Sequence, residues 1–144
     1  MARSSAHKTK RSMDHEVRAI ILFDAKFSQT PPTAEVEKGG ELTVGGTMSE
    51  LRSEGGTHYF NVKFECGRSA GPNKSDVDFS AVYGVLFVSK SGDEGAAAEV
   101  VAKTVVWTKF AELFSVLNGH ASSDMPHLPF QPHFRLEIGD IERE

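Results

Sequence analysis

Apolar and polar side chains alternate through four stretches in the first two thirds of the chain. The clearest are residues 16–27, 57–66 and 77–89, in which apolar residues recur at every second position. A period of two places alternate side chains on one face of a strand, so each stretch predicts a half-buried strand. Residues 41–51 form a weaker candidate, whose central Gly-Gly pair indicates a bulge or bend. The pattern therefore predicts four consecutive strands.

Residues 96–118 are the one stretch with a sustained helical period, in which apolar residues recur at helical spacing. The predicted apolar face consists of Val100, Val101, Val105, Trp107, Phe110, Phe114 and Leu117. Gly119 follows directly, at the place where a left-handed C-cap residue would end the helix. An aromatic face of this width needs a sheet, or a second copy of itself, to cover it.

Four strands followed by one helix predict an α+β fold, in which a four-stranded antiparallel sheet carries the long helix on one face. Strict alternation leaves several apolar residues on the other face, namely Ile20, Leu22, Val82, Leu86 and Val88. An antiparallel sheet normally exposes that face to water. Its apolar character therefore implies a partner surface, either another subunit or a ligand, unless a loop covers it.

The length of 144 residues, with 39% hydrophobic content, supports a single domain. We assign that domain to residues 15–138, between a disordered basic tail at 1–14 and an acidic tail at 139–144. The net charge is −4, and removing the four cations of residues 1–12 leaves the rest of the chain near −8. A body this acidic argues against a nucleic-acid groove, which needs clustered Lys and Arg.

The single cysteine, Cys66, excludes an internal disulfide and fits a reducing compartment, so we expect a cytoplasmic protein. No apolar run is long enough to span a membrane, and the first residues lack the apolar core of a secretory signal. These features predict no membrane insertion.

No set of residues predicts catalysis, and we expect neither an enzyme nor a bound cofactor. The three Gly-Gly pairs lack the strand-to-helix context and the lysine of a phosphate-binding loop. Cys66 lies on the apolar face of a predicted strand, where a core role is expected rather than that of a nucleophile. His120, His127 and His133 are seven and six residues apart, outside the short spacings that direct two imidazoles at one metal ion.

Five short motifs, spread in order over residues 16–136, resemble the SecB family of export chaperones. They are Asp24-Ala25-Lys26-Phe27 followed by Pro31; Tyr59 with Val62 and Phe64; the stretch from Gly84 to Phe87; Trp107 with Phe110; and Pro126-x-Leu128 followed by Pro132 and Phe134. On these motifs the chain resembles a divergent member of that family.

The resemblance implies a homotetramer built as a dimer of dimers, with helices packed between the dimers and the sheets facing outward. Such proteins hold unfolded polypeptides in long apolar grooves without ATP and deliver them to the translocation motor for protein export. Divergent relatives instead protect the antitoxin of a toxin–antitoxin pair. Asp24, in the first motif, would then be an acidic residue that faces a partner.

The leading hypothesis is therefore a holdase, which binds unfolded client polypeptides in apolar grooves. The client-binding candidates are Phe60, Phe64, Val85, Phe87, Met125, Leu128, Phe130 and Phe134. Three prolines keep the segment 124–134 extended, so it could form the lip of a groove. The alternative is that Phe130 and Phe134 only fasten the C-terminal segment to the sheet.

The residues expected in the subunit interface are Trp107, Phe110, Phe114 and Leu117, all on the predicted helix. A different class of protein also fits the pattern, namely a small-molecule or lipid-binding α+β domain in which helix and sheet enclose a pocket. A third alternative is an enzyme whose site the sequence does not reveal.

Overall fold

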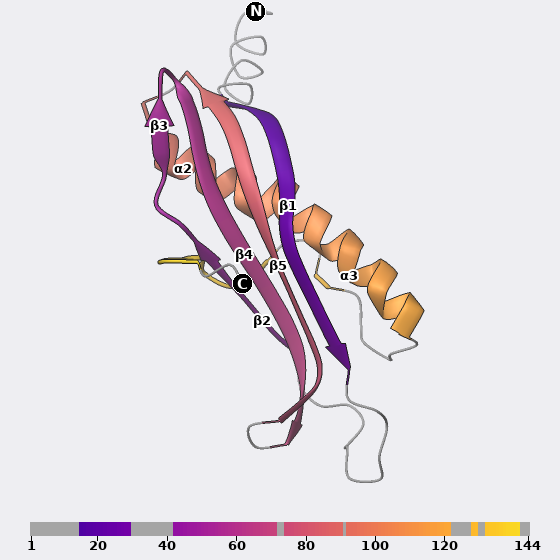
Figure 1. Ribbon diagram of the computed structural model, residues 1–144. Coiled ribbons are helices and arrows are strands. Elements are labelled where there is room, and N and C mark those ends of the chain that lie inside the picture. Colours follow the sequence, from indigo (N-terminus) through magenta and orange to yellow (C-terminus); the bar gives the residue numbers. More distant parts are fainter. Residues whose placement is uncertain are drawn as a thin grey trace, which may run out of the picture.

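The computed structural model describes residues 15–29, 42–71, 74–90, 92–121, 128–129 and 132–141. In this part of the chain a long twisted sheet carries one long helix diagonally across a single face (Figure 1). The predicted basic tail, residues 1–14, lies outside the described residues, as do the last three residues of the predicted acidic tail.

The described residues form a six-stranded sheet with the order β1-β5-β4-β2-β6, and β3 pairs with β4. The strands are β1 (His15–Gln29), β2 (Leu42–Met48), β3 (Arg52–Glu54), β4 (Thr57–Gly71), β5 (Lys74–Ser89) and β6 (Glu137–Ile138). The α+β class and the four long strands are confirmed. The sheet is mixed rather than purely antiparallel, because β6 returns from beyond the helix and pairs in parallel with β2.

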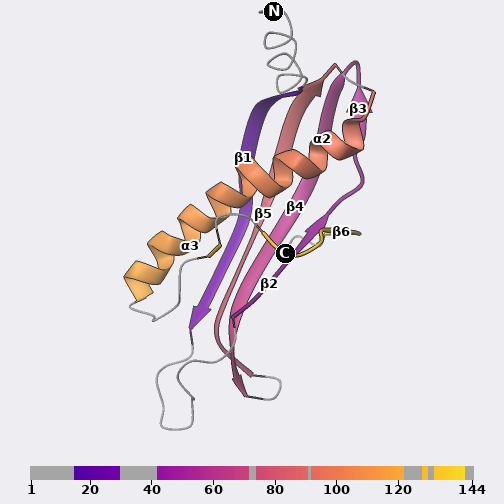
Figure 2. The ribbon, with the colours of Figure 1, turned by 180° about the vertical axis from the view of Figure 1, so that it is seen from behind.

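The helix is one continuous element of three parts: α2 (Glu94–Val101), the π-helical turn η1 (Ala102–Val106) and α3 (Trp107–Ala121). Figure 2 shows it in front of the sheet, with the end of α3 reaching past β1. Asp93 caps the start, where its carboxylate accepts a hydrogen bond from the Ala96 N–H at 3.4 Å. The predicted C-cap at Gly119 is wrong. Glycine permits a left-handed conformation but does not require it, and here the helix continues through Gly119 to Ala121.

The π-helical turn changes which side chains face the sheet. It places one extra residue in the middle of the helix and so rotates the following part by about 100° relative to the preceding part. Val106 and Trp107 are consequently both buried, and Val105 is 41% exposed. Val100 precedes the turn and is 49% exposed because Ala97, Ala98 and Val101 form the buried face of α2. The prediction that Val100 and Val105 continue the apolar face is therefore wrong.

Aromatic contacts join the helix to the two central strands. The Phe64 ring meets Trp107 edge to face, with ring centroids 5.1 Å apart. Phe79 stacks on Phe110 at 5.0 Å and on Phe114 at 5.7 Å. All five side chains are at most 1% exposed, so this aromatic layer forms the centre of the core.

Two β-bulges in β1 reverse the faces that strict alternation predicts. The register with β5 shifts between Val17 and Ala19 and again between Leu22 and Asp24. Each extra residue moves the following side chains to the opposite face. Ile20 therefore packs against the core, contrary to the prediction, while the ring of Phe23 lies over Gly84 on the face away from the helix.

The prediction for Leu22 is wrong for the same reason. Leu22 pairs with Tyr83 and lies on the helix side of the sheet. The prediction that three residues of β5 lie on the face away from the helix is confirmed, because each pairs with a β4 residue on that face. Val82 pairs with Lys63, Leu86 with Tyr59 and Val88 with Thr57.

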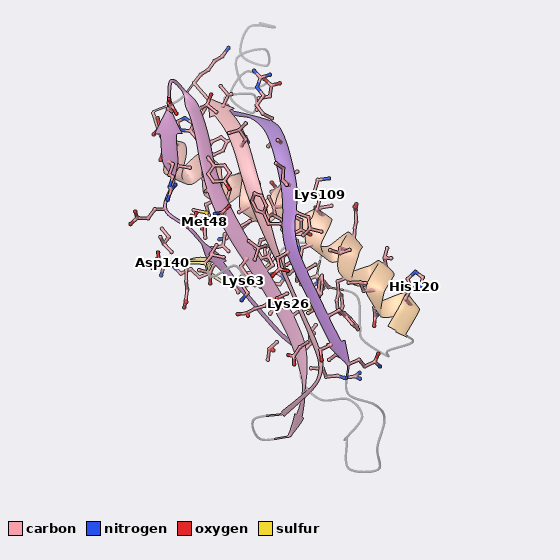
Figure 3. The ribbon with its side chains drawn as sticks, viewed as in Figure 1. Lys26, Met48, Lys63, Lys109, His120 and Asp140 are labelled. Carbon is pink, nitrogen blue, oxygen red and sulfur yellow. The ribbon has the colours of Figure 1, made fainter. Side chains whose placement is uncertain are left out.

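The C-terminal segment, of which residues 128–129 and 132–141 are described, packs against the helix and then reaches the edge of β2. The Trp107 indole N–H donates a hydrogen bond to the carbonyl oxygen of Pro129 at 2.9 Å. Phe134 lies against Trp107, with a centroid distance of 5.5 Å, and Leu136 is buried. The Gly139 N–H then donates to the Met48 carbonyl oxygen at 3.0 Å. Figure 3 shows Asp140 next to Met48 at this edge of the sheet.

Gly46 provides the space that this segment needs. A Cβ at position 46 would lie 2.6 Å from a Leu136 methyl carbon and 2.8 Å from the Phe134 ring. A Cβ on the neighbouring Gly45, on the opposite face, would meet only the Glu65 side chain at an ordinary 3.5 Å.

We predict that Gly46→Val lowers the free energy of unfolding by about 1–3 kcal/mol, because its side chain overpacks the core against Phe134 and Leu136. The matched control, Gly45→Val, should change it by no more than about 0.5 kcal/mol. Urea denaturation of both variants and the wild type measures the difference. Equal stability of the two variants would contradict the described path of the C-terminal segment.

Candidate functional site

Exposed apolar side chains gather at one end of the sheet. Ile21, Leu22 and Phe23, here named the β1 patch, are 52%, 46% and 40% exposed. They surround the free edge of β1 from both sides, because Leu22 lies on the helix side of the sheet and the other two on the opposite face. β1 is an edge strand of the sheet, and none of the described residues pairs with its outer edge. A 15-residue edge strand with apolar side chains is a surface that proteins ordinarily cover or interrupt. The β1 patch is thus a candidate contact surface.

A second apolar surface lies on the side of the helix that faces away from the sheet. Val100, Thr104, Val105 and Thr108 form it, and we name it the helix patch. The Thr104 hydroxyl donates to the Val100 carbonyl oxygen at 2.7 Å, and the Thr108 hydroxyl to that of Thr104 at 2.8 Å. Because both hydroxyls bond to the helix backbone, the helix patch is less polar than its sequence indicates.

An ion pair borders the helix patch. The Lys103 ammonium lies 2.8 Å from the Glu99 carboxylate, one turn earlier in the helix. The hydrogen bond and the charge of Lys103 lower the pKa of Glu99. An exposed pair of this kind contributes little to stability, but it places charge at the margin of an apolar surface.

The predicted interface residues face the chain's own sheet. Trp107, Phe110 and Phe114 are fully buried between the helix and the sheet, and Leu117 is half-buried. A neighbouring subunit that approached the helix would therefore first meet the helix patch rather than these aromatic rings. The sequence pattern identified an apolar face, and the sheet of the same chain covers it.

The predicted client-binding residues fall into three groups. Phe60, Phe64, Val85 and Phe87 are fully buried between sheet and helix, so they offer no surface to a client in this arrangement. Leu128 and Phe134 are half-buried against the core. Met125 and Phe130 lie outside the described residues.

Phe134 makes the contacts that the fastening alternative predicts. Its ring lies 6.1 Å from Phe64 and 5.5 Å from Trp107, edge to face in both contacts. This side chain therefore joins the C-terminal segment to both the sheet and the helix.

On the face of the sheet away from the helix, polar side chains surround the apolar residues. The Tyr59 hydroxyl donates to the Asn61 amide oxygen at 2.7 Å, and the Asn61 backbone N–H donates to Ser49 Oγ at 2.8 Å. Lys26 and Lys63 lie over this face (Figure 3). Asp24 pairs with Val82 there and is half-buried. The predicted partner-facing carboxylate thus lies on the accessible side of the sheet.

Cys66 is a core residue, as its position on an apolar strand face predicts. Burial raises the pKa of its thiol to about 12, and the charges of Asp78 and Glu65 add to the shift. The thiol is therefore protonated at neutral pH, which makes it a poor nucleophile. Within the described ranges, no three side chains of His, Cys, Asp or Glu are grouped so that they could hold a metal ion.

The space between helix and sheet is filled by side chains. The largest of them, among them Trp107, Phe60 and Phe87, are fully buried. A hollow of about 570 Å³ lies instead at the surface beside Arg52, Tyr59 and Asp140. In the described part of the chain, the interior therefore resembles a packed core and not the ligand pocket of a lipid-binding domain.

The fold is SecB-like. It is similar to that of the SecB-like chaperone Rv1957 of Mycobacterium tuberculosis, solved in complex with a ChAD peptide from the Rv1956 HigA1 antitoxin. The TM-score is 0.56 at 13% sequence identity, and the alignment covers 83% of this chain and 91% of that chain. The sequence matches no protein-family model, and a comparison with curated proteins finds no match either. Among the described helices, none has the length and apolar character to cross a membrane.

The buried thiol of Cys66 and the buried phenol of Tyr83 predict how stability depends on pH. Burial, with a smaller effect of the Glu112 charge, raises the pKa of Tyr83 from 10.0 to about 12, and the pKa of Cys66 rises from 9.0 to about 12. The unfolded chain therefore releases these protons at lower pH than the folded chain does. Their contribution is complete below about pH 9 and is lost as the pH rises toward 12.

We predict that the double variant Cys66→Ala/Tyr83→Phe loses less stability than the wild type between pH 9 and 12. Urea denaturation at intervals through this range gives the slope for each protein, which corrects for any constant difference in packing. Parallel slopes would contradict the burial of both groups.

Proposed function

We propose that this protein is an ATP-independent holdase, a chaperone that binds non-native polypeptide and has no catalytic activity of its own. The observation that carries the proposal is a fold similar to that of a chaperone solved in complex with an antitoxin peptide. Unfolded polypeptides expose apolar side chains and unpaired backbone groups. Apolar surfaces next to free strand edges can accept both.

The client-binding region of this proposal lies around the C-terminal segment. Leu128 and Phe134 are half-buried there, where they retain some surface for a client. Met125 and Phe130 belong to the same stretch of the sequence and complete the proposed set. The proposed clients are exported proteins or an antitoxin.

The proposed assembly is a cytoplasmic homotetramer, built as a dimer of dimers. The helix patch supplies one contact between subunits, because Val100 and Val105 are half-exposed and the neighbouring hydroxyls are internally bonded. The β1 patch and its unpaired edge are available for another. Asp24, on the outer face of the sheet, would then remain accessible to a translocation motor.

We predict that the protein suppresses the aggregation of a chemically denatured test enzyme at near-stoichiometric ratio without added ATP, as followed by light scattering. Leu128→Ser/Phe130→Ser should weaken the suppression, because it replaces two apolar side chains of the proposed client region by polar ones. The matched control, Val116→Ser, changes an exposed apolar residue far along α3 and should retain full suppression. Lack of suppression by the wild type would contradict the holdase proposal.

We predict that Val100→Asp/Val105→Asp lowers the molar mass of the assembly, because two carboxylates would be desolvated in the subunit contact. The control Val116→Asp should keep the wild-type mass, and all three proteins should have the same circular dichroism. Size-exclusion chromatography with light scattering measures the mass. A wild type that is monomeric, or a double variant of unchanged mass, would contradict assembly through the helix patch.

A further inference from the structure

The strands β2 and β3 follow the same side of β4, and a gap separates them (Figure 1). β2 ends at Met48 and β3 begins at Arg52. Within the gap, Ser49 replaces a strand partner for Asn61. The Ser49 N–H donates to the Asn61 carbonyl oxygen at 2.8 Å, and the Asn61 N–H donates to Ser49 Oγ, also at 2.8 Å. The regular pairing is therefore interrupted at this point of the edge.

The hollow of about 570 Å³ lies at this gap. Residues 49–52, Tyr59 and Asn61 of β4, and residues 138–140 beyond the helix line it. Figure 3 shows Asp140 at this edge of the sheet. The Tyr59 hydroxyl donates to the Asn61 amide oxygen at 2.7 Å, and both side chains are half-buried. Because this bond uses the amide oxygen, the amide nitrogen of Asn61 remains as a donor, for which the described residues provide no acceptor.

Charges of both signs line the hollow without neutralising one another. The Arg52 guanidinium and the carboxylates of Glu50 and Asp140 all belong to exposed residues. None of these three groups forms an ion pair with another described residue. The Ile138 side chain, which is 69% exposed, adds aliphatic surface. A molecule that carries one ammonium and one carboxylate group would pair with both signs, whereas a molecule of a single charge would be repelled by one of them.

We propose that this hollow binds a free α-amino acid with an aliphatic side chain. Arg52 and the amide nitrogen of Asn61 donate hydrogen bonds to the α-carboxylate of the ligand, for which the planar guanidinium is well suited. Glu50 and Asp140 accept hydrogen bonds from its α-ammonium group. The aliphatic side chain of the ligand lies against Ile138. This binding site goes beyond the proposed holdase function, because its ligand is a small molecule and not a polypeptide client.

The paired charges select a free amino acid over a segment of polypeptide. Within a chain, the α-amino and α-carboxyl groups form neutral peptide bonds, so only a free amino acid presents both charges beside one side chain. The volume of about 570 Å³ falls in the range of small-molecule sites, roughly 300–1,000 Å³. Since the charged groups are exposed to water, each ion pair adds little, and we expect a dissociation constant on the order of 1 mM.

Isothermal titration calorimetry of the full chain with L-leucine and two derivatives tests the proposal. N-acetyl-L-leucine lacks the ammonium group, and L-leucinamide lacks the carboxylate. We expect each derivative to bind about tenfold weaker than L-leucine or worse, the loss expected for one hydrogen bond to a charged group. Arg52→Gln should weaken the binding of L-leucine by a similar factor and leave that of L-leucinamide unchanged. The matched control, Arg18→Gln, removes an exposed arginine of β1 and should keep the wild-type affinity.

Three results of the titration would overturn the proposal: no binding of L-leucine by the wild type up to about 10 mM, affinity for either derivative equal to that for L-leucine, or unchanged affinity of Arg52→Gln. Amide NMR spectra locate the ligand independently. L-leucine should shift the amide signals of Asn61 and Gly139, which lie on opposite sides of the hollow. Shifts confined to residues outside the hollow would overturn the proposal as well. The holdase function does not depend on any of these outcomes, because the aggregation assay tests it separately.

Discussion

The contact between the aromatic face of the helix and the two central strands determines the rest of this structure. Phe79 stacks on both Phe110 and Phe114, while Phe64 meets Trp107 edge to face. Each aromatic pair contributes roughly 0.5–1.5 kcal/mol beyond the burial of its area, and the rings fix the rotation of the helix as well as its position. Because the aromatic face is turned to the sheet, Val100 and Val105 must face outward. The surface available to a second subunit is thus a consequence of the intramolecular core.

The class of fold was predictable because period-two and helical patterns persist over many residues. β4 and β5 alternate without interruption through their central parts, and their apolar residues lie in the core as the pattern predicts. Local insertions were not predictable. One extra residue at each bulge of β1, and one in the π-helical turn, changes the phase of everything that follows. No residue type specifies either insertion, since the register against β5 and the packing of Val106 and Trp107 select them.

The candidate site was predicted less well, for a related reason. Alternation identifies apolar residues but does not distinguish a core face from a binding face. Alternation therefore predicts Phe60, Phe64, Val85 and Phe87 as client-binding residues, although the helix already covers them. The surfaces that remain open, at Ile21–Phe23 and at Val100–Val105, become visible only when the insertions are known. The C-terminal alternation around Phe134 was visible in the sequence, but its partner, Gly46, was predicted only as a bend.

The C-terminal segment connects the stability of the core to the proposed binding of clients. Its first half is held by the Trp107 indole through the Pro129 carbonyl, and its second half by the edge of β2. The Trp107 ring has three aromatic neighbours, and only Phe134 belongs to the C-terminal segment. The other two, Phe64 and Phe110, belong to the sheet and the helix. Release of the β6 half therefore does not require the helix to leave the sheet. A small local opening of this segment is thus separable from global unfolding.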